Sequence, residues 1–205
     1  MKDLFVLTAD EDMRTTVDRL LKRPRSLGIR QVHYATARHR RRDPGCRTDA
    51  SRRLRPHLKE FRYAMVVFDR DGCGRDDAPR EDIQLEVERD LSRNGWENRS
   101  KAIVIEPELE NWVWTGSTHV PRILGWNSYD ELKGWLHEQG RWPDETAKPP
   151  CPKEAMYAAL AKMGRRVSAA YFNRLADKVS MRGCECPAFG ELTDTLQTWF
   201  PVANS

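Results

Sequence analysis

The pattern most suggestive of chemistry is a pair of carboxylates at the end of an apolar run. Residues 65–68 are apolar and predict a buried strand, which ends in Asp69 and Asp71, with Gly72 and Gly74 directly behind them. Alternate residues of an extended chain point to the same side, so both carboxylates are expected to face one place. Two neighbouring negative charges add little stability unless a cation or a positively charged group lies beside them. The pair therefore predicts a divalent-cation site.

Acidic residues also follow two other predicted strands, residues 4–7 and 102–105. They are Asp10, Glu11 and Asp12 after the first of these strands, and Glu106, Glu108 and Glu110 after the second. The carboxyl ends of parallel strands form one edge of a sheet, where ligands bind.

Oxygen ligands from several loops suit Mg²⁺ or Mn²⁺. We predict Asp69, Asp71 and Glu108 as metal ligands and add Glu110 and Asp12 to the catalytic group, since two-metal phosphodiester hydrolysis needs several carboxylates. For the glutamates the alternative is helix capping, because Pro107 fits a first helical position.

Length and composition indicate a soluble protein with a substantial core. The 205 residues are 39% hydrophobic and 32% charged. No apolar run approaches the roughly 20 residues that a membrane-spanning helix requires. The first residues lack the apolar region of a signal peptide. We expect a cytoplasmic protein that does not contact a membrane.

The net charge of +4 is unevenly distributed, with an arginine-rich segment at residues 38–55. Basic residues near a metal site are typical of proteins that hold a polyanion. We predict a nucleic-acid interface, for DNA or RNA, made of Arg40, Arg41, Arg42, Lys148 and Lys153. The two lysines flank a proline-rich loop and could approach either phosphate or the carboxylates. The alternative is that the arginines form a solvated loop and that the lysines are ordinary surface residues.

The order of elements predicts an α/β fold. Strand-like segments at residues 4–7, 29–34, 63–68 and 102–105 alternate with helical segments, the second of which is expected over 48–60, after an arginine-rich loop. This alternation predicts a parallel sheet of about four strands flanked by helices. We expect a core over residues 1–115 and a helical C-terminal extension over 116–205 packed on it. Most of the many tryptophans are expected to pack between the sheet and this helical layer, and the alternative is that they stack on nucleobases. They are Trp112, Trp114, Trp126, Trp135, Trp142 and Trp199.

Three motifs carry a resemblance to a known family. They are Asp69-Arg70-Asp71, Glu108-Leu109-Glu110 and the proline-rich stretch 148–155. The first two, within residues 1–115, resemble the Toprim fold of topoisomerases, primases and overcoming-lysogenization-defect nucleases. Taken whole, the chain resembles a component of bacterial methylation-associated antiphage defence systems, on the stretches 68–74, 106–114 and 148–155. The resemblance implies a Toprim-like, Mg²⁺-dependent nuclease that works with DNA or RNA and with other defence proteins.

One position departs from the Toprim pattern. These proteins usually carry Glu-Gly after the first strand, whereas this chain has Thr8-Ala9. A threonine is neither a base nor a strong metal ligand, so a non-catalytic subunit that binds nucleic acid or a partner protein on a degenerate Toprim-like fold stays open. A receiver-like phosphorylation domain is a third, weaker interpretation, because its acidic pocket matches Asp10, Asp12 and Asp69.

Overall fold

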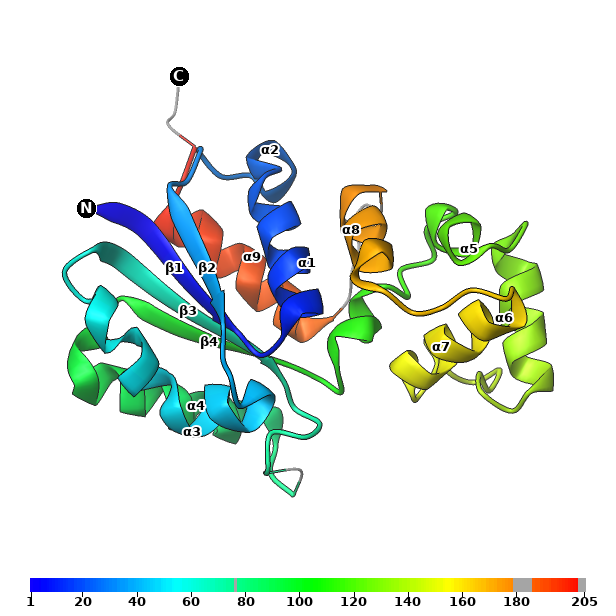
Figure 1. Ribbon diagram of the computed structural model, residues 1–205, viewed down its shortest axis with the longest axis horizontal. Coiled ribbons are helices and arrows are strands. Elements are labelled where there is room, and N and C mark those ends of the chain that lie inside the picture. The colour runs from blue at the N-terminus through cyan, green and yellow to red at the C-terminus, as the bar shows by residue number, and fades with distance from the viewer. Residues whose placement is uncertain (76, 179–185, 203–205) are drawn as a thin grey trace.

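Four parallel strands form the sheet at the centre of the fold (Figure 1). The computed structural model describes residues 1–75, 77–178 and 186–202. The strands are β1 (Lys2–Thr8), β2 (Tyr34–Arg38), β3 (Phe61–Asp69) and β4 (Ser100–Ile105), in the order β2-β1-β3-β4. The predicted parallel sheet of about four strands is therefore confirmed.

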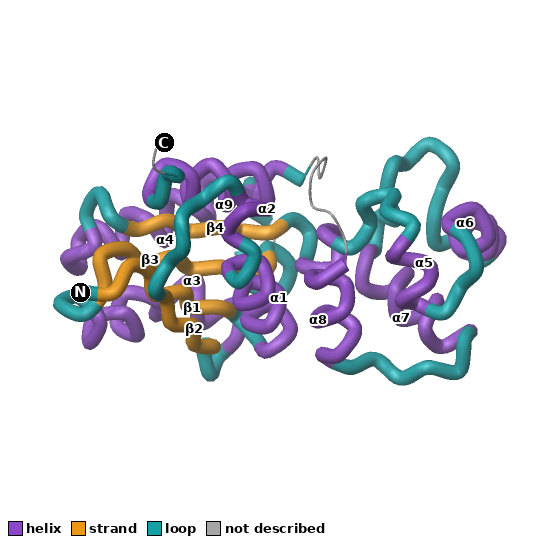
Figure 2. The backbone as a smooth tube through the Cα atoms, turned by 90° about the horizontal axis from the view of Figure 1, so that it is seen from above, coloured by secondary structure: helices purple, strands orange, loops and turns teal. Residues whose placement is uncertain are grey.

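Helices cover both faces of this sheet, as its apolar strands require. One face carries α1 (Glu11–Leu21), α2 (Pro24–Leu27) and α9 (Pro187–Trp199), and the other carries α3 (Arg42–Leu54) and α4 (Arg80–Leu91) (Figures 1 and 2). Short helical turns follow two of them, η1 (Arg55–His57) after α3 and η2 (Ser92–Trp96) after α4. Strand β3 is buried from Ala64 to its last residue, so its end delivers Asp69 into the interior.

Two predicted boundaries are wrong around the second strand. Residues 29–33 precede β2 instead of forming it, because Ile29 bridges to Pro201 and the Arg30 N–H donates to the Phe200 carbonyl at 3.0 Å. The arginine-rich segment is mostly helical, since α3 begins at Arg42, six residues before the predicted start. Arginine is a good helix former, and a proline is tolerated in a first helical turn, where Pro44 lies.

The C-terminal part of the chain divides between two places (Figures 1 and 2). Helices α5 (His119–Leu124), α6 (Tyr129–Glu138) and α7 (Pro152–Lys162) form a lobe beside the sheet, which we call the helical lobe. Helix α8 (Ala169–Lys178) packs on α1, and α9 returns to the sheet. None of the described helices is long and apolar enough to cross a membrane.

Tryptophans build the core of the helical lobe. Trp114 and Trp142 are buried with their rings 5.3 Å apart. The indole N–H groups of Trp114 and Trp126 donate to the carbonyls of Pro152 and Ala159 at 3.1 and 3.2 Å. Buried indoles need such partners. Their predicted role in the core is confirmed.

Arg80 joins the two helical layers beside the edge strand β4. Its guanidinium, on α4, donates to both carboxylate oxygens of Glu191 on α9 at 3.1 and 3.0 Å, and Arg80 is 5% exposed. We expect Arg80→Met to destabilise the fold by about 2 kcal/mol, because two hydrogen bonds between charged groups are lost and Glu191 loses its paired cation. Urea unfolding of this variant and of Arg80→Met/Glu191→Leu measures the effect. The double variant should recover part of the lost stability. An Arg80→Met variant as stable as the unchanged protein would contradict a stabilising role of the Arg80–Glu191 pair.

Candidate functional site

A cavity of about 560 Å³ lies at the carboxyl ends of β1, β2 and β3, and α7 of the helical lobe forms part of its wall. Its lining is strongly polar. The acidic residues are Asp10, Glu11, Asp12, Asp69 and Glu110, and the basic ones are Arg38, Arg40, Arg42 and Lys153. The carboxyl edge of a parallel sheet is the usual place for a ligand.

Asp69 lies at the buried end of this cavity. The residue is 8% exposed, and its backbone N–H donates to Asp43 Oδ1 at 2.9 Å. Among the described residues, none offers a hydrogen bond to Asp69 Oδ1. Burial raises the pKa of this carboxyl well above its usual range, and the negative charges of Asp43 and Glu110 raise it further. A buried carboxylate oxygen without a partner is costly, so it marks a place where a ligand would be stabilised.

Asp43 and Asp10 extend the acidic group beneath the cavity. Asp43 comes from the first turn of α3, and burial raises the pKa of its carboxyl. Asp10 caps α1, with its Oδ1 accepting the Met13 N–H at 2.9 Å. The sequence interpretation missed Asp43 because the residue lies within the arginine-rich run, which gives no signal that a helix turns it toward β3.

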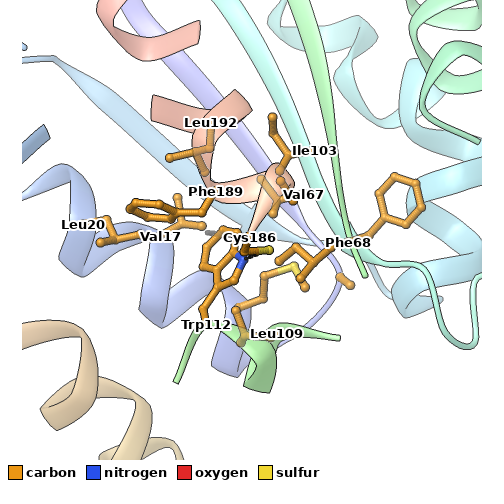
Figure 3. Packing of buried hydrophobic residues seen from close by; sticks show 14 of the residues in the cluster. Val17, Leu20, Val67, Phe68, Ile103, Leu109, Trp112, Cys186, Phe189 and Leu192 are labelled. Carbon is orange, nitrogen blue, oxygen red and sulfur yellow. Dashed lines mark hydrogen bonds between the residues drawn. The ribbon is translucent and has the colours of Figure 1, made fainter. Parts of the chain in front are cut away.

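Glu110 enters the cavity from η3 (Leu109–Trp112), a turn fixed by its apolar residues. Trp112 packs edge-on against Phe189 at 5.3 Å, and its indole N–H donates to Cys186 Sγ at 3.2 Å (Figure 3). With Leu109 also buried, the turn leaves the Glu110 side chain 3% exposed. Burial raises the pKa of Glu110 to about 7, although the charge of Lys153 acts in the opposite direction.

Lys153, at the start of α7, contacts both glutamates of this turn. Its backbone N–H donates to Glu108 Oε1 at 2.8 Å, and its Nζ lies 3.4 Å from Glu108 Oε2 and 3.7 Å from Glu110 Oε1. Glu108 is therefore held by the N-terminus of α7 and does not line the cavity. Lys153 is placed as predicted beside the acidic group, but its nearest partners are carboxylates.

Like Glu108, the predicted site residues Asp71 and Lys148 lie outside this cavity. The exposed Asp71 side chain pairs with Arg70 Nη1 at 3.5 Å, because the chain turns after Asp69 and no longer alternates. Lys148 donates to the Asn111 carbonyl at 2.9 Å. By contrast, Asp12 does line the cavity, and burial raises the pKa of its carboxyl.

Arginines from the segment after β2 form the basic rim of the cavity. Arg40 and Arg42 line it, as does Arg38, whereas Arg41 is exposed outside it. His39 fixes the segment from below, with its Nδ1 accepting the Arg41 N–H at 3.1 Å and its Nε2 lying 3.5 Å from Asp49 Oδ2.

The buried His39 ring fits only because residue 45 is glycine. A Cβ there would lie 1.9 Å from His39 Nδ1. Burial lowers the pKa of His39, so the ring is neutral at pH 7 and donates through Nε2. Both ring nitrogens are engaged, which makes His39 a positioning residue. Its role was not visible from sequence spacing.

Thr8 is the last residue of β1. Its buried hydroxyl lies 3.2 Å from the Asp10 carbonyl and 3.3 Å from the Ala37 carbonyl. The hydroxyl therefore holds the ends of β1 and β2 together and does not line the cavity.

Comparison of the chain with protein-family models, curated proteins and solved structures finds no match.

The donor chemistry of the cavity fits a hard divalent cation, since it offers carboxylate oxygens and one of them is buried without a partner. A closed ligand set is not formed: within the described part of the chain, no three Asp, Glu, His or Cys side chains are arranged to hold a metal ion. Glu108 is turned toward α7, and Lys153 Nζ lies beside Glu110. Asp69, Glu110 and Asp10 are the residues that would hold such an ion.

Proposed function

We propose that this chain is a Mg²⁺- or Mn²⁺-dependent nuclease that hydrolyses phosphodiester bonds of DNA or RNA in bacterial antiphage defence. The observation that carries the proposal is Asp69, a buried carboxylate with an unpartnered oxygen that faces a cavity rimmed with arginines. A cation would stabilise the ionised form of such a carboxyl, and such a rim suits a phosphate backbone. The setting in antiphage defence rests on the resemblance of the motifs around Asp69 and Glu108.

Each group has a role in this proposal. Asp69, Glu110 and Asp10 would hold the cation, which would polarise the scissile phosphate and lower the pKa of an attacking water. Asp12 accepts a proton from that water, a role that suits a carboxyl whose pKa is raised by burial. Arg40 and Arg42 orient the nucleic-acid backbone through charge-assisted hydrogen bonds.

Incubation of the purified protein with plasmid, single-stranded DNA and RNA, each with Mg²⁺ or Mn²⁺, tests the proposal. Cleavage that is lost in Asp69→Ala supports it. Calorimetry that detects no metal binding, together with no cleavage of any substrate, would overturn it.

Two observations favour a second candidate, a non-catalytic subunit that binds nucleic acid. Thr8 replaces the usual glutamate, and Lys153 places a positive charge of the protein itself beside Glu108 and Glu110. This candidate uses the same basic rim, so binding without cleavage would separate it from the nuclease.

Arg40→Gln/Arg42→Gln is expected to weaken single-stranded DNA binding about tenfold and to reduce the slope of log affinity against log salt by about two. Fluorescence anisotropy at several salt concentrations measures both quantities. The matched control is Arg25→Gln/Arg62→Gln, which removes the same charge from exposed positions outside the cavity. Equal losses in the two double variants would show that overall charge, and not the rim, binds DNA.

A further inference from the structure

Lys153 places an ammonium group beside two of the carboxylates at the sheet edge. Its Nζ lies 3.4 Å from Glu108 Oε2 and 3.7 Å from Glu110 Oε1, and the positive charge also reaches Asp69. Lys153 is half-buried, so solvent screens these contacts less than it screens an ion pair on the surface.

Glu108 and Glu110 differ in how much they depend on the Lys153 ammonium. Glu108 keeps a second bond to α7 through the Lys153 backbone N–H at 2.8 Å, and this bond does not depend on the ammonium. For Glu110, Lys153 Nζ is the one cationic partner within ion-pair distance among the described residues. Departure of the ammonium would therefore leave the helical lobe attached through Glu108 while freeing Glu110.

A second observation is that one carboxylate oxygen of the acidic group has no partner in the described part of the chain, although Lys153 is paired with Glu108 and Glu110. Asp69 is only 8% exposed, and its Oδ1 has no hydrogen-bond partner among the described residues. The residue lines the same cavity as Glu110 and Lys153. Lys153 thus lies beside the Glu108 and Glu110 carboxylates and leaves Asp69 Oδ1 without a partner within residues 1–75, 77–178 and 186–202. A small hard cation would satisfy both Glu110 and Asp69.

We propose that Lys153 is a tethered counterion that a divalent cation displaces from Glu110, so that the helical lobe sets the metal affinity of the sheet edge. This inference rests on the proposed metal-dependent function. It adds that the Lys153 ammonium and the metal ion compete for Glu110. The ammonium lies near Glu110 in the metal-free protein and away from it in the metal-bound protein. The lysine aliphatic stem allows such a movement without unfolding α7.

Mn²⁺ binding by isothermal calorimetry at constant pH and ionic strength tests this competition. We expect Lys153→Gln and Lys153→Met to bind Mn²⁺ at least about tenfold more tightly than the unchanged protein. Two controls remove a positive charge elsewhere: Lys148→Gln, whose Nζ contacts the Asn111 carbonyl, and Arg42→Gln, on the cavity rim. Both should stay within about threefold of the unchanged protein, because they lack the contact with Glu110.

The side-chain ¹⁵N resonance of Lys153 provides a readout that does not depend on affinity. In lysine-labelled protein, Mg²⁺ is expected to shift one ammonium resonance, which is absent from Lys153→Gln. Cooperative thermal melting of each variant checks that it folds, and Lys153→Met keeps most of the aliphatic stem if the glutamine variant does not.

The outcomes separate this inference from the proposed function. Metal binding that is equal or weaker in both Lys153 variants, or equally strengthened in Arg42→Gln, overturns the competition and leaves the proposed function standing. Absence of Mn²⁺ binding in the unchanged protein and in every variant overturns the proposed function and this inference with it.

Discussion

Asp69→Asn is expected to abolish cleavage while making the metal-free protein more stable. Asparagine has nearly the same volume as aspartate, so packing at the end of β3 is preserved. It removes a buried negative charge that lies near Asp43 and Glu110, whose charges raise the pKa of the Asp69 carboxyl. Functional groups held in such unfavourable surroundings are a common cause of a trade-off between stability and activity.

The expected changes in cleavage rate and in stability follow from the loss of the metal-binding carboxylate and of its buried charge. Loss of the Asp69 carboxylate should reduce cleavage at least about 1,000-fold, because several kcal/mol of charge stabilisation disappear. Stability at pH 7 in EDTA should rise by about 1–2 kcal/mol, a few degrees in melting temperature. Cleavage assays with Mn²⁺ and thermal melting with EDTA measure the two effects on the same preparation.

Asp71→Asn is the matched control for this experiment. It makes the same chemical change two residues away, on an exposed side chain paired with Arg70. Melting temperature should not change, and cleavage should remain within about threefold of the unchanged protein. If Asp71→Asn abolished cleavage and Asp69→Asn did not, the site would lie at the turn that the sequence pattern favours, and the cavity assignment would be wrong.

The contrast between Asp69 and Asp71 shows how far sequence reasoning reaches. The apolar residues before Asp69 predict a buried strand, and this pattern is enough to place the Asp69 carboxylate at the end of that strand. The step to Asp71 assumed that the chain stays extended, but β3 ends at Asp69 and the Asp71 N–H donates to the Pro107 carbonyl at 3.1 Å. Whether a strand continues for two residues depends on such tertiary contacts, which no local pattern contains.

Asp43 and Lys153 illustrate two different reasons why a site is hard to read from sequence. Asp43 lies 26 residues before Asp69 and has no pattern of its own, so its hydrogen bond to the Asp69 N–H follows from the packing of α3 on β3. Lys153 was identified as basic and close to the carboxylates. Its pairing with Glu108 and Glu110 depends on how the helical lobe packs against the sheet edge, which the sequence did not reveal.

Glu110 is expected to make the stability of the metal-free protein fall as pH rises from about 4.5 to about 7. Burial raises the pKa of its carboxyl from the ordinary value of 4.5 to about 7 in the folded protein. Between these values the folded state holds a proton that the unfolded state has released, so raising the pH favours unfolding. The contribution is fully present below pH 4.5 and is lost above pH 7.

The interval between 4.5 and about 7 corresponds to about 3 kcal/mol in the free energy of unfolding. Glu110→Gln cannot release this proton, so its stability should exceed that of the unchanged protein by a margin that grows by about this amount over the interval. Urea unfolding in EDTA at pH 4.5, 5.5, 6.5 and 7.5 measures the difference. Glu154→Gln, on the exposed side of α7, is the control and should follow the unchanged protein at every pH. A Glu110→Gln curve parallel to that of the unchanged protein would mean that Glu110 is already ionised and solvated at pH 4.5, which contradicts its burial beside Lys153.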